Sequence, residues 1–413
     1  MSLPASKTTY AFTTENFTND GMLFQKWHPI SAINALTVSS EPPLTLGERR
    51  SFQLVASFEQ GPPGFRMHLI GKWLTLVPQR MGLSAALDNS AALMATVHAA
   101  MLHDRSPSTW IGPEAYYQAI KSLRQALEDP IECYSVETLS ATAILYYIEA
   151  IFGSPVEWNL VHHAGGVSRL LEARGPGKHK SGFEMLITRQ MQGIAVNYET
   201  HSDTEASIQK LLELMVSWSD LSIEFRRYLK GQLSSPASNE LRQRLAKTKS
   251  RLDSINMAIE EIFSSERDIT QVKSSRNDPV LETVLDFKDY TFAVMLVLHD
   301  SYELIVNRML SILDPRNITP QVECRNEWLV TRICRSYEYA WKRRPMGAQH
   351  MYVPLTVAFL QAKTEEMRTW ILQALNDLDE HRMLPTPRFT ASAITYLAQV
   401  YTGETDPIVP SNS

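Results

Sequence analysis

Helical periodicity is the feature of this sequence that most restricts its fold. Across most of the 413 residues, apolar side chains recur three and four positions apart, and the every-second-residue alternation of strands is scarce. Residues 136–152 carry apolar side chains on one broad face, which predicts a helix central to the core. Several such segments follow one another with short connections, as expected for antiparallel neighbours. The sequence therefore predicts an all-α fold, a multi-helix array of antiparallel helix pairs with no significant sheet.

Composition and breaker residues divide the chain into three parts. Residues 1–45 are rich in Ser, Thr, Asn and Pro and predict an irregular N-terminal leader. Residues 46–403 predict a single helical domain, with exposed polar segments near 231–238 and 264–279. Residues 404–413 predict a C-terminal tail. Four long helices are expected in the last third of the domain, at about 280–312, 320–343, 351–379 and 388–402.

A heptad-like seam marks the middle of the chain. From Leu241 to Ile262, apolar residues stand alternately four and three positions apart, with one polar interruption at Thr248. Three heptads are enough to form a coiled coil with a partner helix. We favour a long surface helix packed on its own domain, because most helical stability in proteins comes from packing an amphipathic face.

Charge and cysteine content argue against several classes of protein. Lys and Arg total 40 against 45 Asp and Glu, so the basic excess of a nucleic-acid-binding domain is missing. Cys133, Cys324 and Cys334 are too dispersed for a disulfide framework or a structural zinc site. The N-terminal residues contain no apolar core of signal-peptide length, and the longest apolar stretch, around Phe292–Leu298, is too short to span a bilayer. We expect a reducing compartment and no membrane association.

The common catalytic and cofactor motifs are not found. Gly175-Pro176-Gly177-Lys178 lacks the spacing of a phosphate-binding loop, and Gly166–Leu170 lacks the second glycine of a nucleophile elbow. His162 and His163 are adjacent and would point apart on a helix, so they are poorly placed to share a metal. The acidic cluster Asp377–Glu380 is interpreted as a solvated helix end. We therefore predict no catalytic, cofactor-binding or metal-ligating residues and favour a non-enzyme, while catalysis by scattered residues stays an open alternative.

Three basic clusters are interpreted as solvated surface rather than as nucleic-acid or targeting sites. The clusters are Arg226-Arg227 with Lys230, then Lys247 with Lys249 and Arg251, and finally Lys342–Arg344. The cluster Lys342–Arg344 is the candidate for a nuclear-localisation patch, although three residues are a weak signal.

A more specific pattern lies between residues 154 and 176. Eight residues follow the spacing W-x3-H-x2-G-x4-LL-x2-RGP, namely Trp158, His162, Gly165, Leu170, Leu171, Arg174, Gly175 and Pro176. This pattern resembles the signature of the regulatory domain of fungal-specific Zn2Cys6 transcription factors. Segments 115–127 and 135–149 upstream, and 333–340 and 354–358 downstream, are also similar to segments of that family, so the resemblance spans roughly residues 65–400.

The signature residues have a physical interpretation as structural elements. Trp158 and Leu170-Leu171 supply apolar anchors, and His162 is expected to make a structural hydrogen bond. Arg174 is expected to bond the last carbonyls of its helix and to fix the turn at Gly175-Pro176.

The chain departs from the family at its N-terminal side. Family members normally carry an N-terminal zinc cluster of six cysteines, whereas residues 1–132 of this chain contain no cysteine. The resemblance therefore implies a transcriptional regulator or co-regulator without its own DNA-binding module, with a fungal secondary-metabolite gene cluster as a candidate target. The implied partners are a protein, such as a DNA-binding transcription factor, and a small-molecule effector. No direct nucleic-acid contact is expected, and a homodimer is compatible with the sequence.

The expected location is the nucleus, with the cytoplasm as a second compartment. Two other interpretations stay open. One is an incomplete gene structure whose first exon, carrying the zinc cluster, is missing. The other is a helical domain recruited as a small-molecule-binding protein or a biosynthetic enzyme that uses the helical cavity.

Overall fold

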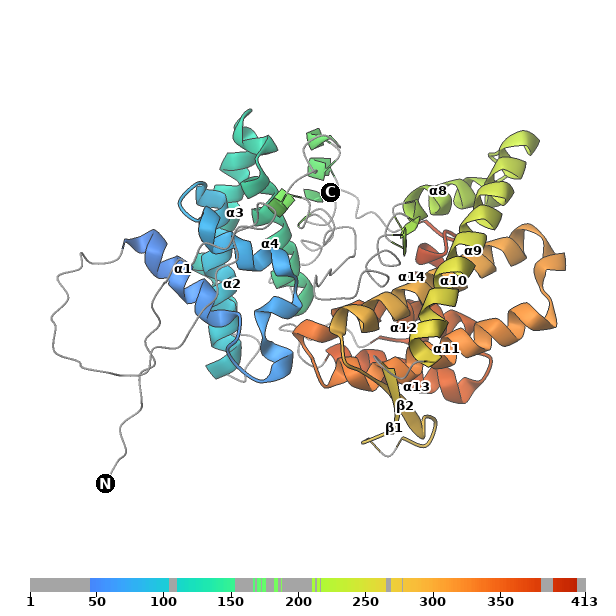
Figure 1. Ribbon diagram of the computed structural model, residues 1–413. Helices are drawn as coiled ribbons and strands as arrows, with labels where there is room; N and C mark the ends of the chain where they lie inside the picture. Colours follow the sequence, from blue (N-terminus) through green and yellow to red (C-terminus); the bar gives the residue numbers. More distant parts are fainter. Residues whose placement is uncertain are drawn as a thin grey trace, which may run out of the picture. The chain divides into compact units, whose positions relative to one another are not determined.

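The computed structural model describes residues 45–103, 110–152, 217–264, 269–276, 278–379 and 389–406, with scattered residues between 166 and 215 (Figure 1). The chain divides into two compact units, Met1–Leu44 and Thr45–Ser413, and every described residue belongs to the second. The predicted leader, residues 1–45, thus lies outside the described residues except for Thr45.

The described part of the chain is all-α, which confirms the predicted fold class; its one sheet is a two-stranded hairpin. The α-helices in the first half of the chain are α1 (Leu46–Ser57), α2 (Ala85–His103), α3 (Pro113–Glu128) and α4 (Val136–Phe152). Those in the second half are α8 (Trp218–Leu229), α9 (Ser235–Ser264), α10 (Tyr290–Leu313), α11 (Pro320–Trp341), α12 (Tyr352–Gln361), α13 (Glu365–Asp379) and α14 (Ala391–Tyr401). Every helix in these ranges is too short or too polar to cross a membrane.

The first hydrophobic core is built around α4, which packs beside α2 and α3 (Figure 1). Ser135 precedes α4 and accepts a hydrogen bond from the Thr138 N–H at 3.0 Å, so it satisfies one of the free donors at the helix start. Almost every side chain of α4 is buried, including the acid Glu137, which pairs with Arg80. The prediction that this helix is central to the core is confirmed.

The second core surrounds α10, which α9, α11 and α12 contact. The seam of α9 is buried against this core, with Leu241, Leu245, Leu252 and Ile259 fully enclosed and Thr248 buried beside them. The preferred interpretation, a long helix packed on its own domain, is confirmed. The helix starts earlier than predicted, at Ser235, and so takes in part of the polar segment 231–238.

The hairpin is a correction to the predicted helix pattern. Strand β1 (Ile269–Lys273) lies in the segment expected to be a polar loop, and β2 (Thr283–Phe287) replaces the first turns of the helix expected from 280. The side chains of Val284, Leu285 and Phe287 are buried, and β2 packs against α11. These tertiary contacts select a strand, a choice that a short apolar run does not specify. Helix α10 begins only after Asp289, whose carboxylate accepts from the Phe292 N–H at 2.8 Å.

The helix predicted over 351–379 is also wrong in one respect, because it is two helices. Helix α12 ends at Gln361, Ala362 adopts an extended conformation, and α13 starts at Glu365. The Thr364 hydroxyl accepts from the Met367 N–H at 3.2 Å, which caps the second helix.

Candidate ligand groove and buried charge network

The described signature residues lie on the first core. Leu170 is buried there and Leu171 packs against it. Arg174 is buried, and its guanidinium donates to the Tyr134 carbonyl and, at 2.8 Å, to the Glu184 carboxylate. Arg174 therefore ties its segment to the residue before the cap of α4.

The turn that follows Arg174 is described only in part. Gly175 has a φ of 71°, the left-handed conformation that glycine adopts readily at a helix end, and its N–H bonds the Leu171 carbonyl at 3.3 Å. Trp158, His162, Gly165 and Pro176 lie outside the described residues.

The described titratable residues that were singled out from the sequence lie in separate environments. No group of three or more His, Cys, Asp or Glu side chains among the described residues is arranged to hold a metal ion. Burial raises the pKa of the Cys334 thiol, which disfavours its reactive thiolate form. Asp377, from the predicted acidic cluster, accepts hydrogen bonds from Arg276 at 2.6 Å and from Tyr337 at 3.3 Å.

The first two basic clusters are largely engaged by acids or carbonyls. In the first, Lys230 pairs with Asp406 at 2.6 Å, and Arg226 donates to the Thr405 carbonyl at 2.9 Å. In the second, Lys249 bonds both Asp253 and Glu303. The charges of Arg226, Lys230 and Lys249 are thus used within the fold.

The third basic cluster, at the end of α11, is held by the same helix. Lys342 pairs with Glu338 at 2.9 Å. The Arg343 and Arg344 guanidinium carbons lie 3.5 Å and 3.7 Å from the ring centres of Tyr339 and Trp341. Each therefore packs as a cation on an aromatic ring.

A groove with a volume of about 380 Å³ opens between α9 and the end of α10. The α9 wall of the groove is formed by Arg242, Ala246, Lys249, Ser250 and Asp253. The last four stand four, seven, eight and eleven positions after Arg242, so all five lie on one face of the helix. The facing wall is formed by the last turn of α10 and the turn after it, with Leu310, Leu313, Asp314 and Asn317. The volume falls within the range of small-molecule sites.

A buried ion pair between α10 and α11 lies farther along α10. Arg332 of α11 donates to both carboxylate oxygens of Asp300, with Nε at 2.7 Å from Oδ2, and also donates to Glu260 of α9 at 2.7 Å. The His299 ring contacts Asp300 through Nδ1 and the Leu252 carbonyl through Nε2, each at 3.0 Å. The network therefore links α9, α10 and α11. Burial alone would raise the Asp300 pKa, but Arg332 and His299 outweigh it and the pKa is lowered.

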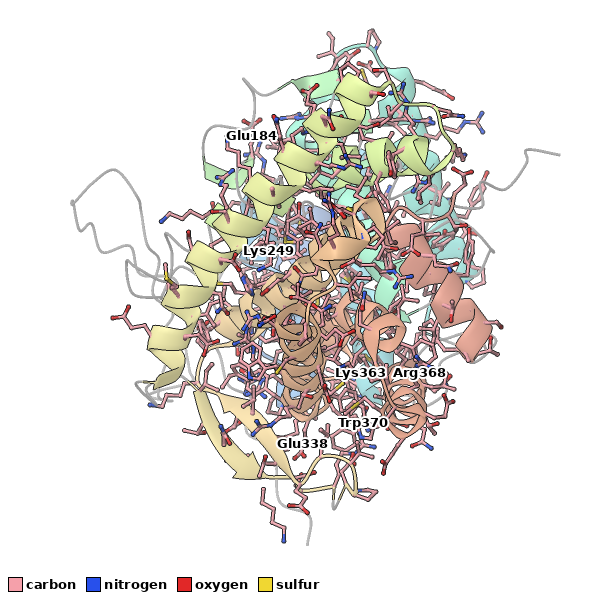
Figure 2. All side chains as sticks on the ribbon, turned by 90° about the vertical axis from the view of Figure 1, so that its right-hand side faces the viewer. Glu184, Lys249, Glu338, Lys363, Arg368 and Trp370 are labelled. Carbon is pink, nitrogen blue, oxygen red and sulfur yellow. The ribbon has the colours of Figure 1, made fainter. Side chains whose placement is uncertain are left out.

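A second buried acid connects this network to the groove. Glu303 of α10 is fully buried and accepts from Arg325 at 3.0 Å and 2.7 Å, while Lys249 lies 3.1 Å away. Burial would raise the Glu303 pKa, but Arg325 and Lys249 lower it overall. Figure 2 labels Lys249 on the long helix α9. Because Lys249 also lines the groove, a bound molecule would lie beside one of the two cations that neutralise Glu303.

An exposed tryptophan lies between the two arginines of these networks. The ring centre of Trp328 is 4.3 Å from the guanidinium carbon of Arg325 and 3.8 Å from that of Arg332. These three residues follow the i, i+3, i+7 spacing of one face of α11.

A further buried carboxylate holds the hairpin. Glu338 of α11 accepts from the Ser274 hydroxyl at 2.9 Å, from the N–H and hydroxyl of Ser275, and from Lys342. Burial opposes ionisation, yet these donors lower the Glu338 pKa to about 2. The label of Glu338 lies next to the hairpin in Figure 2.

Sequence reasoning did not find the two networks. Charged residues at 300 and 303, inside an otherwise apolar helix, were the available signal, because acids are rarely buried unless they are paired. The arginines at 325 and 332 share one helix face, but their partners are distant in sequence.

Comparison of the chain with family models, with curated proteins and with solved structures gives no significant match. The resemblance to the fungal regulatory domain thus rests on the residues quoted above and stays a prediction.

Proposed function

We propose that this protein is a transcriptional regulator or co-regulator that acts through a protein partner and carries no DNA-binding module of its own. The partner would be a DNA-binding transcription factor, since residues 1–132 lack the cysteines of a zinc cluster and the chain has no basic excess. The proposal places the protein in the nucleus and gives it a fungal secondary-metabolite gene cluster as its target.

The observation that carries this proposal is the proximity of the family-like segments. Segment 115–127 lies in α3, segment 135–149 begins one residue before α4 and continues in it, and these two helices pack together. Arg174 of the signature bonds the Tyr134 carbonyl just before α4. Two segments that resemble the family thus pack on each other, and the signature bonds the residue next to one of them, as a shared architecture would require.

A small-molecule effector is part of the proposal, and the groove between α9 and α10 supports it. The same groove favours a second candidate function, a recruited small-molecule-binding protein or biosynthetic enzyme. The two functions differ in what the protein controls: a regulator changes transcript levels, whereas an enzyme changes only the flow of metabolites.

Deletion of the gene, with transcripts and metabolites measured together, separates the candidates. A regulator predicts that a set of transcripts falls along with their products, and that the intact chain restores both. Unchanged transcripts, an accumulated intermediate and turnover of that intermediate by the pure protein would contradict the proposal and favour the enzyme.

The need for a partner can be tested separately. The full chain fused to a heterologous DNA-binding domain should change expression of a reporter that carries the matching site, whereas the unfused chain should not. Equal reporter expression with and without the fusion would argue against a regulatory role.

A further inference from the structure

We infer that the groove between α9 and α10 binds a small amphipathic carboxylate, with Arg242 holding the carboxylate and the apolar floor holding the hydrocarbon body. This inference rests on the proposed function, for which it names the chemical class of the effector. It depends on three features of the groove: its unpaired cation, its paired acids and its apolar floor.

Arg242 is a groove cation that has no acidic partner among the described residues. Its guanidinium donates to the Leu313 carbonyl at 3.2 Å and to the Asn239 side-chain oxygen at 3.4 Å, both of which are neutral acceptors. No carboxylate among the described residues lies within ion-pair distance of it. A guanidinium carries five N–H donors in a planar fork, so donors remain for a bidentate carboxylate.

Both acids that line the groove already have a cation. Asp253 pairs with Lys249, and Asp314 accepts from the Arg316 side chain at 2.7 Å to 3.1 Å. The Arg316 hydrogen bonds are the main reason why the Asp314 pKa is lowered to about 2, with a smaller effect from the charge of Arg242. An incoming carboxylate would therefore reach the Arg242 guanidinium without having to displace from it any acid of the described residues.

The floor of the groove suits a hydrocarbon body. Ala246 of α9 faces Leu310 and Leu313 of α10 across a space of about 380 Å³, which is large enough for a small ligand. Ala246 leaves room where a larger side chain would fill the groove. Burying each methylene of a ligand there contributes about 0.8 kcal/mol, so affinity should rise with chain length until the floor is covered.

The first test measures binding of sodium octanoate to the purified full chain by isothermal titration calorimetry, with octanol and octylamine as matched probes. We expect octanoate to bind and the other two to bind at least tenfold more weakly, because a charge-assisted hydrogen bond contributes about 1.5–3 kcal/mol. Equal binding of all three, or no octanoate binding at millimolar concentration, would overturn the inference.

Variants locate the site. Arg242→Gln should weaken octanoate binding about tenfold. Lys247→Gln removes the same charge from an exposed position on α9 outside the groove and should leave binding unchanged. Ala246→Phe should block binding by filling the groove, whereas Gln243→Phe, at another exposed position of α9, should not. Ala246→Phe decides the question if Arg242→Gln fails to fold. Equal affinity in all four variants would refute the assignment of the groove.

The outcome for the groove is distinguishable from the outcome for the proposed function. If octanoate does not bind while transcripts still depend on the gene, only the groove assignment fails. If octanoate binds as expected while transcripts are unchanged in the deletion strain, the groove assignment stands and the proposed function fails.

Discussion

The buried pair between Arg332 and Asp300 gives the sharpest prediction for stability. Arg332→Met removes a cation that is 4% exposed and leaves Asp300, which is fully buried, with a hydrogen bond to the His299 ring in place of its bidentate guanidinium partner. Glu260, the other acid that Arg332 binds, has a side chain 40% exposed and can be hydrated. The cost is therefore concentrated on Asp300. Breaking a buried pair from one side destabilises proteins by about 3–5 kcal/mol, and we expect a loss in that range.

The double variant tests the cause of that loss. Asp300→Leu combined with Arg332→Met removes both charges, so no uncompensated buried ion remains. We expect the double variant to be more stable than Arg332→Met alone, which requires a coupling free energy between the two sites that is larger than the cost of Asp300→Leu alone. The matched control is Lys363→Met, which breaks an exposed pair with Glu327 at 3.1 Å and should cost no more than about 1 kcal/mol.

Urea unfolding followed by circular dichroism at pH 7 provides the measurement, at low and at high salt. Because buried pairs are screened far less than exposed ones, the loss in Arg332→Met should persist at high salt. A loss below about 1 kcal/mol in Arg332→Met, or a double variant as unstable as the sum of the two single variants, would refute the reasoning.

Three further predictions concern single contacts, each read from thermal unfolding. Gly64→Ala should cost about 1–3 kcal/mol, because its Cβ would lie 2.3 Å from the Arg344 carbonyl oxygen, whereas the control Gly47→Ala, with open space around it, should not destabilise. Gly403→Ala should cost a similar amount, since φ is 74° and its Cβ would lie 2.6 Å from the backbone of α8. The wild-type protein should be thermally more stable than Glu338→Gln at neutral pH. This difference in stability should disappear as the pH falls from about 4.5, the ordinary pKa of the carboxyl, towards its folded pKa of about 2. A pH-independent difference would contradict the last prediction.

Sequence periodicity was a sound guide wherever local pattern and tertiary packing agree. The seam of α9 was predicted from spacing alone, and the structure buries it from Leu241 to Ile259. The spacing did not reveal where the helix begins, because the start at Ser235 lies in a polar stretch without apolar periodicity. The hairpin was missed for a related reason. A short run such as Thr283–Phe287 fits a strand or a helix, and its packing on α11 decides between them.

The candidate site was less predictable than the fold, because its parts come from separate helices. Arg242 and Leu313 are 71 positions apart, yet the antiparallel packing of α9 and α10 brings them within 3.2 Å. A residue pattern within one helix shows which face is polar, but not which charges find partners. Arg242 and Lys249 both line the groove from α9, and only the structure shows that Lys249 bonds acids while Arg242 meets neutral oxygens.

Because Lys249 bonds acids while Arg242 meets neutral oxygens, a ligand bound in the groove would affect the buried charges of the core through Lys249. Lys249 lines the groove and also neutralises Glu303, which is fully buried and shares α10 with Asp300. A carboxylate bound at Arg242 would bring negative charge towards Lys249 and compete with Glu303 for it. The energetic cost of weakening that contact would fall on a buried acid, which would keep Arg325 as its remaining cation. Because the two effects are thermodynamically linked, we expect substitutions of Lys249 to change both the octanoate affinity and the stability of the α9–α10 contact. Substitutions of Lys247 should change neither.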